Sequence, residues 1–139
     1  MPSDDNKSLN ARWIQAFNDR DWATETACRA PDFTAHMSGM PEPLNSAGWD
    51  GFMQAFTTAF PDARITPERT LAEGAETVIR WRITGTHRGE FQGVPATGRP
   101  VALDGIEWNR FVDGKIAEHW AQFDLVAVLG QIGALPPPA

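Results

Sequence analysis

The chain has 139 residues, a length that suits one domain with a substantial core, and 42% of its residues are apolar. Its formal net charge is -6 and its basic residues do not cluster, which argues against nucleic acid or an anionic membrane as a partner. The apolar runs are too short to span a membrane, the N-terminus resembles no signal or transit peptide, and the single Cys28 excludes an intrachain disulfide, so we expect a cytoplasmic protein.

The first part of the chain predicts helices. Leu9, Trp13 and Phe17 recur at helical spacing and predict a helix over residues 5–19. Asp21 can cap a second helix over residues 21–30, which must stop before a proline. Residues 32–37 can form a short strand, and residues 38–46 are rich in proline and glycine and predict a loop.

Aromatic residues form the strongest apolar stripe of the chain. Trp49, Phe52, Phe56 and Phe60 fall at helical spacing, just before a proline, and predict a third helix. We expect this helix to pack on the core. Phe52 and Phe56 can also turn one edge towards a pocket.

From residue 62 the apolar period changes to two, which predicts strands over residues 65–71, 77–83, 99–111 and 115–123. A short helix over residues 125–132 follows, and residues 136–138 are prolines that predict a frayed tail. Helices followed by antiparallel strands indicate one α+β domain over residues 1–139, ordered at about 5–133. Its helices would cover one face of a strongly curved antiparallel sheet and enclose a pocket.

Asp113-Gly114 predicts a two-residue hairpin turn that pairs Val112 with Lys115 and so fixes which side chains share a face. A slip of one residue would exchange the faces of one strand. The predicted pocket face mixes aromatic groups with carboxylates and amides: Leu103, Glu107, Asn109, Phe111, Ile116, Glu118, Trp120, Gln122 and Asp124. The opposite face would carry Asp104, Ile106, Trp108, Arg110, Ala117, His119, Ala121 and Phe123.

Two segments carry a family resemblance. The stretch GTHRGEFQGVPATGR at residues 85–99, and RFVDGKIAEHW at residues 110–120 with Asp124 and LGQIG at residues 129–133 behind it, are similar to the signatures of SnoaL-like polyketide cyclases in the NTF2-like superfamily. The resemblance extends from Leu9 to Gly133. It implies a cone-shaped NTF2-like fold with a deep pocket, a dimer or larger assembly, no metal and no organic cofactor.

The resemblance also implies a reaction and its residues. Cyclases of this family close a polyketide ring by intramolecular aldol condensation on a hydrophobic, carbonyl-bearing substrate, and an aspartate at the end of the last strand moves the proton. Motif position makes Asp124 that aspartate and places His36, Glu107 and Asn109 among the polar groups of the pocket. The expected catalytic residues are therefore Asp124, Glu107 and His36; the expected substrate-binding residues are Asn109, Trp120, Phe111, Gln122, Phe52 and Phe56.

Several alternatives stay open at this point. Asp124 stands before a helix and can be only its N-cap, and His36 can be a surface residue. His87 reads as a structural residue at the pocket rim, and His119 as a packing or interface residue. The pocket could also hydrolyse an epoxide, isomerise a ketosteroid-like substrate, or bind a small ligand without catalysis.

The sequence also predicts how the molecule assembles. Because the non-pocket face is apolar, we expect a symmetric homodimer through the sheet, with Trp108 and Phe123 near the two-fold axis. The three histidines are too scattered to suggest a ligand set, so chelation should change neither stability nor activity.

Overall fold

The computed structural model describes residues 2–135, with side chains from residue 5 onward. Its elements follow in the order α1 (Pro2–Asn18), α2 (Trp22–Ala27), β1 (Arg29–Met37), α3 (Ser46–Ala59), β2 (Arg64–Glu73), β3 (Glu76–Thr86), β4 (Pro100–Val112), β5 (Lys115–Phe123) and α4 (Leu125–Gln131). The predicted kinds and order of elements are confirmed, and the predicted proline tail lies outside the described residues. No described helix is long and apolar enough to cross a membrane.

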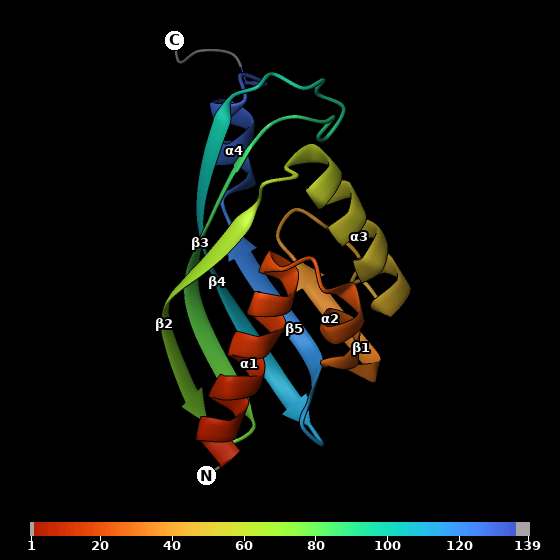
Figure 1. Cartoon of the computed structure of the whole chain (residues 1–139), viewed down its shortest axis with the longest axis vertical. Helices are drawn as coiled ribbons and strands as arrows, with labels where there is room; N and C mark the ends of the chain where they lie inside the picture. The colour runs from red at the N-terminus through yellow and green to blue at the C-terminus, as the bar shows by residue number, and fades with distance from the viewer. Residues whose placement is uncertain (1, 136–139) are drawn as a thin grey trace.

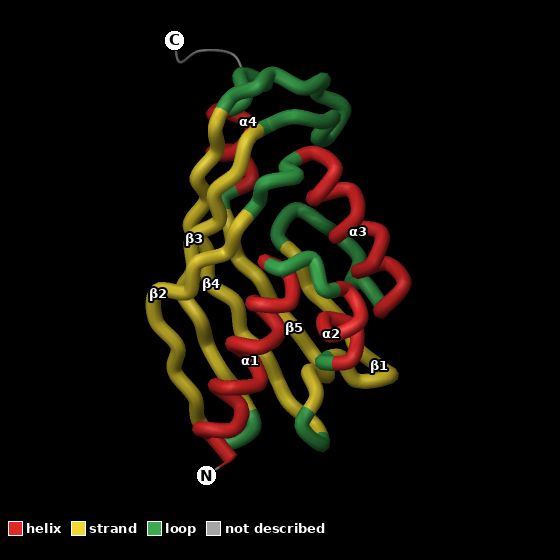
Figure 2. The backbone as a smooth tube through the Cα atoms, viewed as in Figure 1, coloured by secondary structure: helices red, strands yellow, loops and turns green. Residues whose placement is uncertain are grey.

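The five strands form one curved sheet in the order β1-β5-β4-β3-β2. Neighbouring strands are antiparallel except β1 and β5, which pair in parallel, so the prediction of a purely antiparallel sheet is wrong at this edge. The reason is topological, because β1 comes from the helical part of the chain and joins the sheet beside the last strand. Figure 1 shows α1, α2 and α3 on one side of the sheet. A long loop joins β3 to β4, and Figure 2 draws this loop in green. The short helix α4 lies near that end of the sheet.

Local signals explain where the helices begin and end. Asp21 and Asn45 each accept a backbone N–H three residues ahead, from Thr24 and Gly48, and so cap α2 and α3. α3 ends just before Pro61, which cannot continue a helix. Its apolar stripe packs against the concave, inner face of the sheet and closes the space between helices and strands.

The pairing of β4 with β5 departs from the simple hairpin. Phe111 pairs with Ile116 as predicted, but Arg110 then pairs with Glu118, so Ala117 is an extra residue in β5. This β-bulge reverses the alternation along the rest of the strand. Glu107 and Asn109 of β4 keep their predicted inner face. On β5 beyond the bulge the prediction is wrong: the inner residues are His119, Ala121 and Phe123, and the outer ones are Glu118, Trp120 and Gln122.

Candidate functional site

A cavity of about 140 Å³ lies between the inner face of the sheet and the helices. Aromatic side chains from α1, α3, β3, β5 and the loop between β3 and β4 line it: Trp13, Phe17, Trp49, Phe52, Phe56, Trp81, Phe91 and Phe123. Among the described residues that line it, the titratable ones are Glu25, Glu107 and His119. The cavity is therefore an apolar chamber with few places where a proton can be taken up or released.

One row of paired residues crosses three strands below this cavity. Thr77 of β3 lies opposite Asn109 of β4, which lies opposite His119 of β5. Asn10 of α1 contacts this row, and its Oδ1 accepts hydrogen bonds from Thr77 Oγ1 (2.6 Å) and Asn109 Nδ2 (2.7 Å). A buried polar row of this kind is stable only when its members satisfy one another, so it fixes how α1 sits on the sheet.

Asn109 determines the state of the two groups beside it. Its Nδ2 also donates to Glu107 Oε2 at 2.6 Å, so its Oδ1 faces His119 and accepts from Nδ1 at 2.6 Å. The imidazole proton therefore lies on Nδ1 and leaves Nε2 as a free acceptor. The indoles of Trp13 and Trp49 meet the imidazole edge to face, with ring centroids 5.2 and 5.1 Å away.

Burial controls the charge of this pair. Burial raises the pKa of Glu107 to about 7, against the lowering effect of hydrogen bonds from Asn109, Asn10 and Trp81. Burial lowers the pKa of His119 to about 3, with a smaller contribution from the charge of His36. Glu107 Oε2 and His119 Nδ1 are 3.6 Å apart, within ion-pair distance. Even so, burial outweighs this attraction and favours the neutral form of both groups.

Trp81 reaches the same corner because the facing residue of β4 is glycine. A Cβ on Gly105 would lie 2.5 Å from the Trp81 ring, so only glycine lets the indole lie flat across the strand. Trp81 Nε1 is buried without a hydrogen bond of good geometry, although it lies near enough to Glu107 to lower the pKa of that carboxyl. The indole thus closes the cavity beside Glu107.

The expected position of Asp124 is wrong. Its carboxylate accepts the backbone N–H of Ala127 at 3.0 Å and caps α4, and the side chain is exposed. The physical reason is its place after the last strand, where an aspartate satisfies a free N–H of the following helix. The N-cap alternative describes its position, and Asp124 does not line the cavity.

Three further expected site residues lie on the outer face: Trp120 and Gln122 because of the bulge in β5, and His36 because it pairs with Trp120 from the neighbouring β1. His36 Nε2 is 2.7 Å from Glu118 Oε2, and the imidazole stacks on Trp120 at 5.4 Å. Gln122 is exposed and receives a contact from Ser38. The predicted pocket position of His36, Trp120 and Gln122 is therefore wrong, and so is the predicted outer position of His119.

The remaining expected residues stay on the inner side. Glu107, Phe52 and Phe56 line the cavity. Asn109 and Phe111 are buried on the inner face but do not line it, so Asn109 acts through its neighbours and Phe111 through core packing. The structure thus brings together one of the three expected catalytic groups with two of the six expected binding groups.

The glycine-rich loop between β3 and β4 forms the upper wall. Its Phe91 and Gln92 line the cavity. His87 is fully buried and bonds Thr97 through Nδ1, at 2.9 Å to Oγ1 and 3.2 Å to N, which pins the two ends of the loop together. Gly89 packs on the Thr58 carbonyl, where a Cβ would clash. The structural interpretation of His87 therefore fits its contacts, and Figure 1 shows the loop reaching towards α3.

The interpretation from sequence missed His119, Trp81 and Glu25. One signal for His119 was present: beyond Glu118 the set His119, Ala121 and Phe123 is more apolar than its alternates, and so favours the inner face. No signal marked Glu25, because its position depends on three helices meeting. Within the described residues, no group of three or more histidine, cysteine, aspartate or glutamate side chains could hold a metal ion.

Comparison with known proteins agrees with this geometry. The SnoaL-like polyketide cyclase family matches residues 7–132. The chain is 32% identical to AclR from Streptomyces galilaeus, described as a proposed hydroxylase (94% of this chain, 97% of that one, TM-score 0.86). It is 34% identical to IdmH from Streptomyces antibioticus, described as a proposed polyketide cyclase (92% and 98%, TM-score 0.83).

A third similar structure, a proposed SnoaL-like polyketide cyclase from Jannaschia sp., shares 23% identity over 97% of this chain and 95% of that one, with a TM-score of 0.88, and supports the fold alone. No protein with curated annotation matches the chain at a significant level. The family match covers nearly the whole chain, and the curved sheet, the helices on its inner side and the enclosed cavity agree with it. The chain belongs to the SnoaL-like polyketide cyclase family, whose NTF2-like fold it has, and the family match supports a cyclase-type function.

Proposed function

We propose that the chain closes a ring in a hydrophobic, carbonyl-bearing small molecule by intramolecular aldol condensation, with Glu107 as the proton-transfer group. The observation that supports this is the Glu107–His119 pair at 3.6 Å in a mainly apolar cavity. A group with a pKa of about 7 offers both its basic and its acidic form at neutral pH, which is the condition that general acid–base catalysis needs.

The proposed step conserves atoms and protons. The Glu107 carboxylate takes a proton from a carbon beside one carbonyl, and the resulting enolate carbon attacks a second carbonyl carbon of the same molecule. The oxygen of that second carbonyl then receives the proton from the Glu107 carboxylic acid. His119 Nε2, which carries no proton, accepts a hydrogen bond from a substrate hydroxyl or enol. The aromatic wall, including Phe52 and Phe56, holds the apolar part of the substrate.

Proton abstraction can be tested without knowing the natural substrate. A set of apolar aromatic diketones is incubated with the protein in D2O, and mass spectrometry measures deuterium next to the carbonyls and any ring-closed product. Glu107→Gln keeps the shape of the side chain but cannot carry the proton, so exchange should fall roughly 10²- to 10⁴-fold. Glu118→Gln is the matched control, since this carboxylate of the adjacent strand lies on the outer face.

The outcomes separate the candidate functions. Exchange by the Glu107→Gln variant at the wild-type rate would refute the proposal. Exchange with ring closure supports the cyclase. Exchange with a shifted double bond and no new ring would instead group the chain with proton-shuttling isomerases.

A further inference from the structure

A second buried carboxylate lines the cavity beside the proposed proton-transfer pair. Glu25 of α2 is 2% exposed, and its Oε2 accepts the indole N–H of Trp13 at 2.7 Å and that of Trp49 at 3.0 Å. Its Oε1 is 3.1 Å from Arg29 Nη2. Every partner is a donor, and both oxygens are occupied, so Glu25 is not free to exchange a proton with a substrate.

This one carboxylate joins three helices. Trp13 comes from α1 and Trp49 from α3, and their rings stack with centroids 5.6 Å apart. A buried indole needs an acceptor for its N–H, so the two bonds to Glu25 also fix how far each ring rotates. Arg29 holds Glu25 from behind, and its guanidinium bonds Asp50 Oδ1 at 2.6 Å and Ser46 Oγ at 2.8 Å.

The two indoles held in this way are those that meet His119. Both approach the imidazole edge to face, at interplanar angles of 82° and 73°. Asn109 holds the Nδ1 side of the ring, and both indoles contact the imidazole edge to face. We propose that Glu25 is a positioning residue, which through Trp13 and Trp49 holds the His119 imidazole in the orientation that leaves Nε2 free for the substrate.

The effect of Glu25 on catalysis rests on the proposed function. Its effect on the orientation of the His119 imidazole does not. The charged and titratable groups around His119 are Glu107 of β4 at 3.6 Å, His36 of β1, whose charge lowers the pKa of His119, and Glu25 of α2 behind the indoles. Burial is the main reason that the pKa of His119 is low. Released indoles would admit water to the ring, so its pKa should rise.

The test uses Glu25→Gln, which keeps the side-chain volume but has one acceptor oxygen in place of two and no charge. Whichever way the amide turns, its NH2 group faces a donor, either Arg29 or the two indole N–H groups, so the contacts that fix the indoles are weakened. Nitrogen NMR of the imidazole in full-length protein reports its tautomer and its pKa. In the wild type we expect the Nδ1–H form to persist below pH 5. In the variant, the pKa should rise by about one unit or more and the tautomers should mix. The α-proton exchange rate should fall roughly tenfold.

Asp50→Asn is the matched control, because it removes the exposed carboxylate partner of Arg29 but leaves Glu25 and both indoles in place. It should leave the His119 signals and the exchange rate unchanged. If Glu25→Gln does not fold, Trp13→Phe and Trp49→Phe each remove one N–H bond and keep an aromatic ring, and each should give part of the same change.

A folded Glu25→Gln variant with wild-type His119 signals would overturn the inference. So would Phe variants with wild-type signals where Glu25→Gln does not fold. Failure of the proposed function would give another result. The Glu107→Gln variant would then exchange α-protons at the wild-type rate, while the NMR signals of the His119 imidazole would still change in Glu25→Gln.

Discussion

Two histidine–glutamate pairs lie on opposite faces of the same sheet. His119 and Glu107 are buried on the inner face and 3.6 Å apart, whereas His36 and Glu118 are partly exposed on the outer face and only 2.7 Å apart. The pKa of Glu107 rises to about 7 because of burial, but the pKa of Glu118 falls, chiefly because His36 hydrogen-bonds its carboxylate. Identical residue types thus give the proposed proton-transfer group on one face and an ordinary surface contact on the other.

Desolvation, rather than the identity of the partner, separates the two pairs. On the inner face the neutral imidazole donates its Nδ1–H to Asn109 Oδ1 instead of Glu107, so the carboxyl gains no countercharge. On the outer face water and Arg110, whose Nη2 is 3.3 Å from Glu118 Oε1, stabilise the carboxylate. Substitutions on one face of the sheet, compared with matched substitutions on the other face, therefore test this difference.

The largest expected effect is on the pH dependence of stability. The pKa of Glu107 is near 4.5 in the unfolded chain and about 7 in the folded one, so its contribution is complete below pH 4.5 and is lost as the pH rises through 7. The loss amounts to about 3 kcal/mol. Glu107→Gln should remove it, so the stability difference between variant and wild type should shift in favour of the variant by about this amount between pH 4.5 and 8.

Urea unfolding across this pH range measures the effect. His119 acts in the opposite direction, because its pKa is lowered, and its contribution is lost as the pH falls from 6.5 through 3. Glu118→Gln is the control and should keep the wild-type loss of stability on the alkaline side, because Glu107 is unchanged in it. A pH-independent difference between Glu107→Gln and the wild type would mean that Glu107 is ionised and solvated in the folded state.

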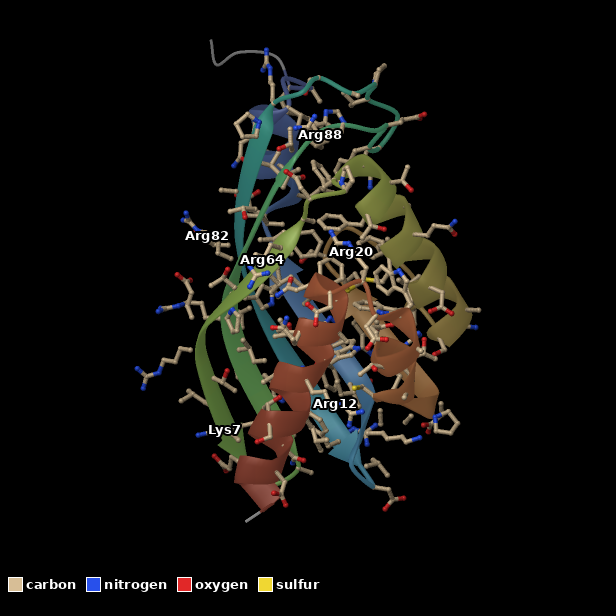
Figure 3. The ribbon with its side chains drawn as sticks, in the orientation of Figure 1. Lys7, Arg12, Arg20, Arg64, Arg82 and Arg88 are labelled. Carbon is tan, nitrogen blue, oxygen red and sulfur yellow. The ribbon has the colours of Figure 1, made fainter. Side chains whose placement is uncertain are left out.

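The second prediction concerns the outer face, which we propose forms a homodimer. Leu71, Val78, Trp108 and Trp120 are directly paired in a row across four strands, and Trp108 is 48% exposed. Figure 3 shows Arg82, further along β3, pointing away from the helices. Phe123 lines the cavity instead, so Trp120 replaces it beside Trp108 in the expected interface.

Trp108→Glu should weaken association by about 2 kcal/mol or more, which is roughly 30-fold in Kd, because a central aromatic residue would be replaced by a charge. Sedimentation at several concentrations measures this. Glu107→Gln, one residue away but inside, should leave Kd unchanged. A wild-type monomer of about 15 kDa at micromolar concentration would refute the dimer.

The third prediction tests whether Asp124 affects only stability, or proton exchange as well, as Glu107 and His119 should. Asp124→Ala should lower the free energy of unfolding by about 1 kcal/mol, the usual effect of losing an N-cap bond. The α-proton exchange rate per folded molecule should not change, because the carboxylate lies outside the cavity. A loss of exchange beyond tenfold in folded Asp124→Asn would restore the role that the family motif implies.

Periodicity was sufficient for the kinds and order of the elements and for part of the site. The apolar alternation of β4 placed Glu107 and Asn109 inside, and the stripe of α3 supplied Phe52 and Phe56. One extra residue, Ala117, moved His119 inward and Trp120 outward. A hairpin turn fixes register only up to the first bulge, so local turn chemistry could not place the distal end of β5.

Sequence patterns could not predict the buried polar contacts, for a different reason. Asn10 and Asn109 are 99 positions apart, and Glu25 joins residues of two other helices. No spacing rule links such residues, since the contact exists only after the helices have docked on the sheet. The resemblance to known cyclases located the pocket but assigned the proton to Asp124, a residue that this fold uses as a cap.

The smallest expected effect is on the outer pair itself. His36→Gln and Glu118→Gln should each change stability by only about 0.5 kcal/mol, and a double-mutant cycle should give a coupling energy below about 1 kcal/mol. The short distance does not raise these values, because both side chains keep contact with water and salt screens them. Since the pKa of Glu118 is lowered, this small contribution is present above pH 4.5 and disappears as the pH falls. Added salt should weaken it further. A coupling of several kcal/mol that resisted salt would mean that the outer face is dehydrated as the inner one is, as it would be within a tight dimer, and dilution below the Kd would then reduce the coupling to the surface value.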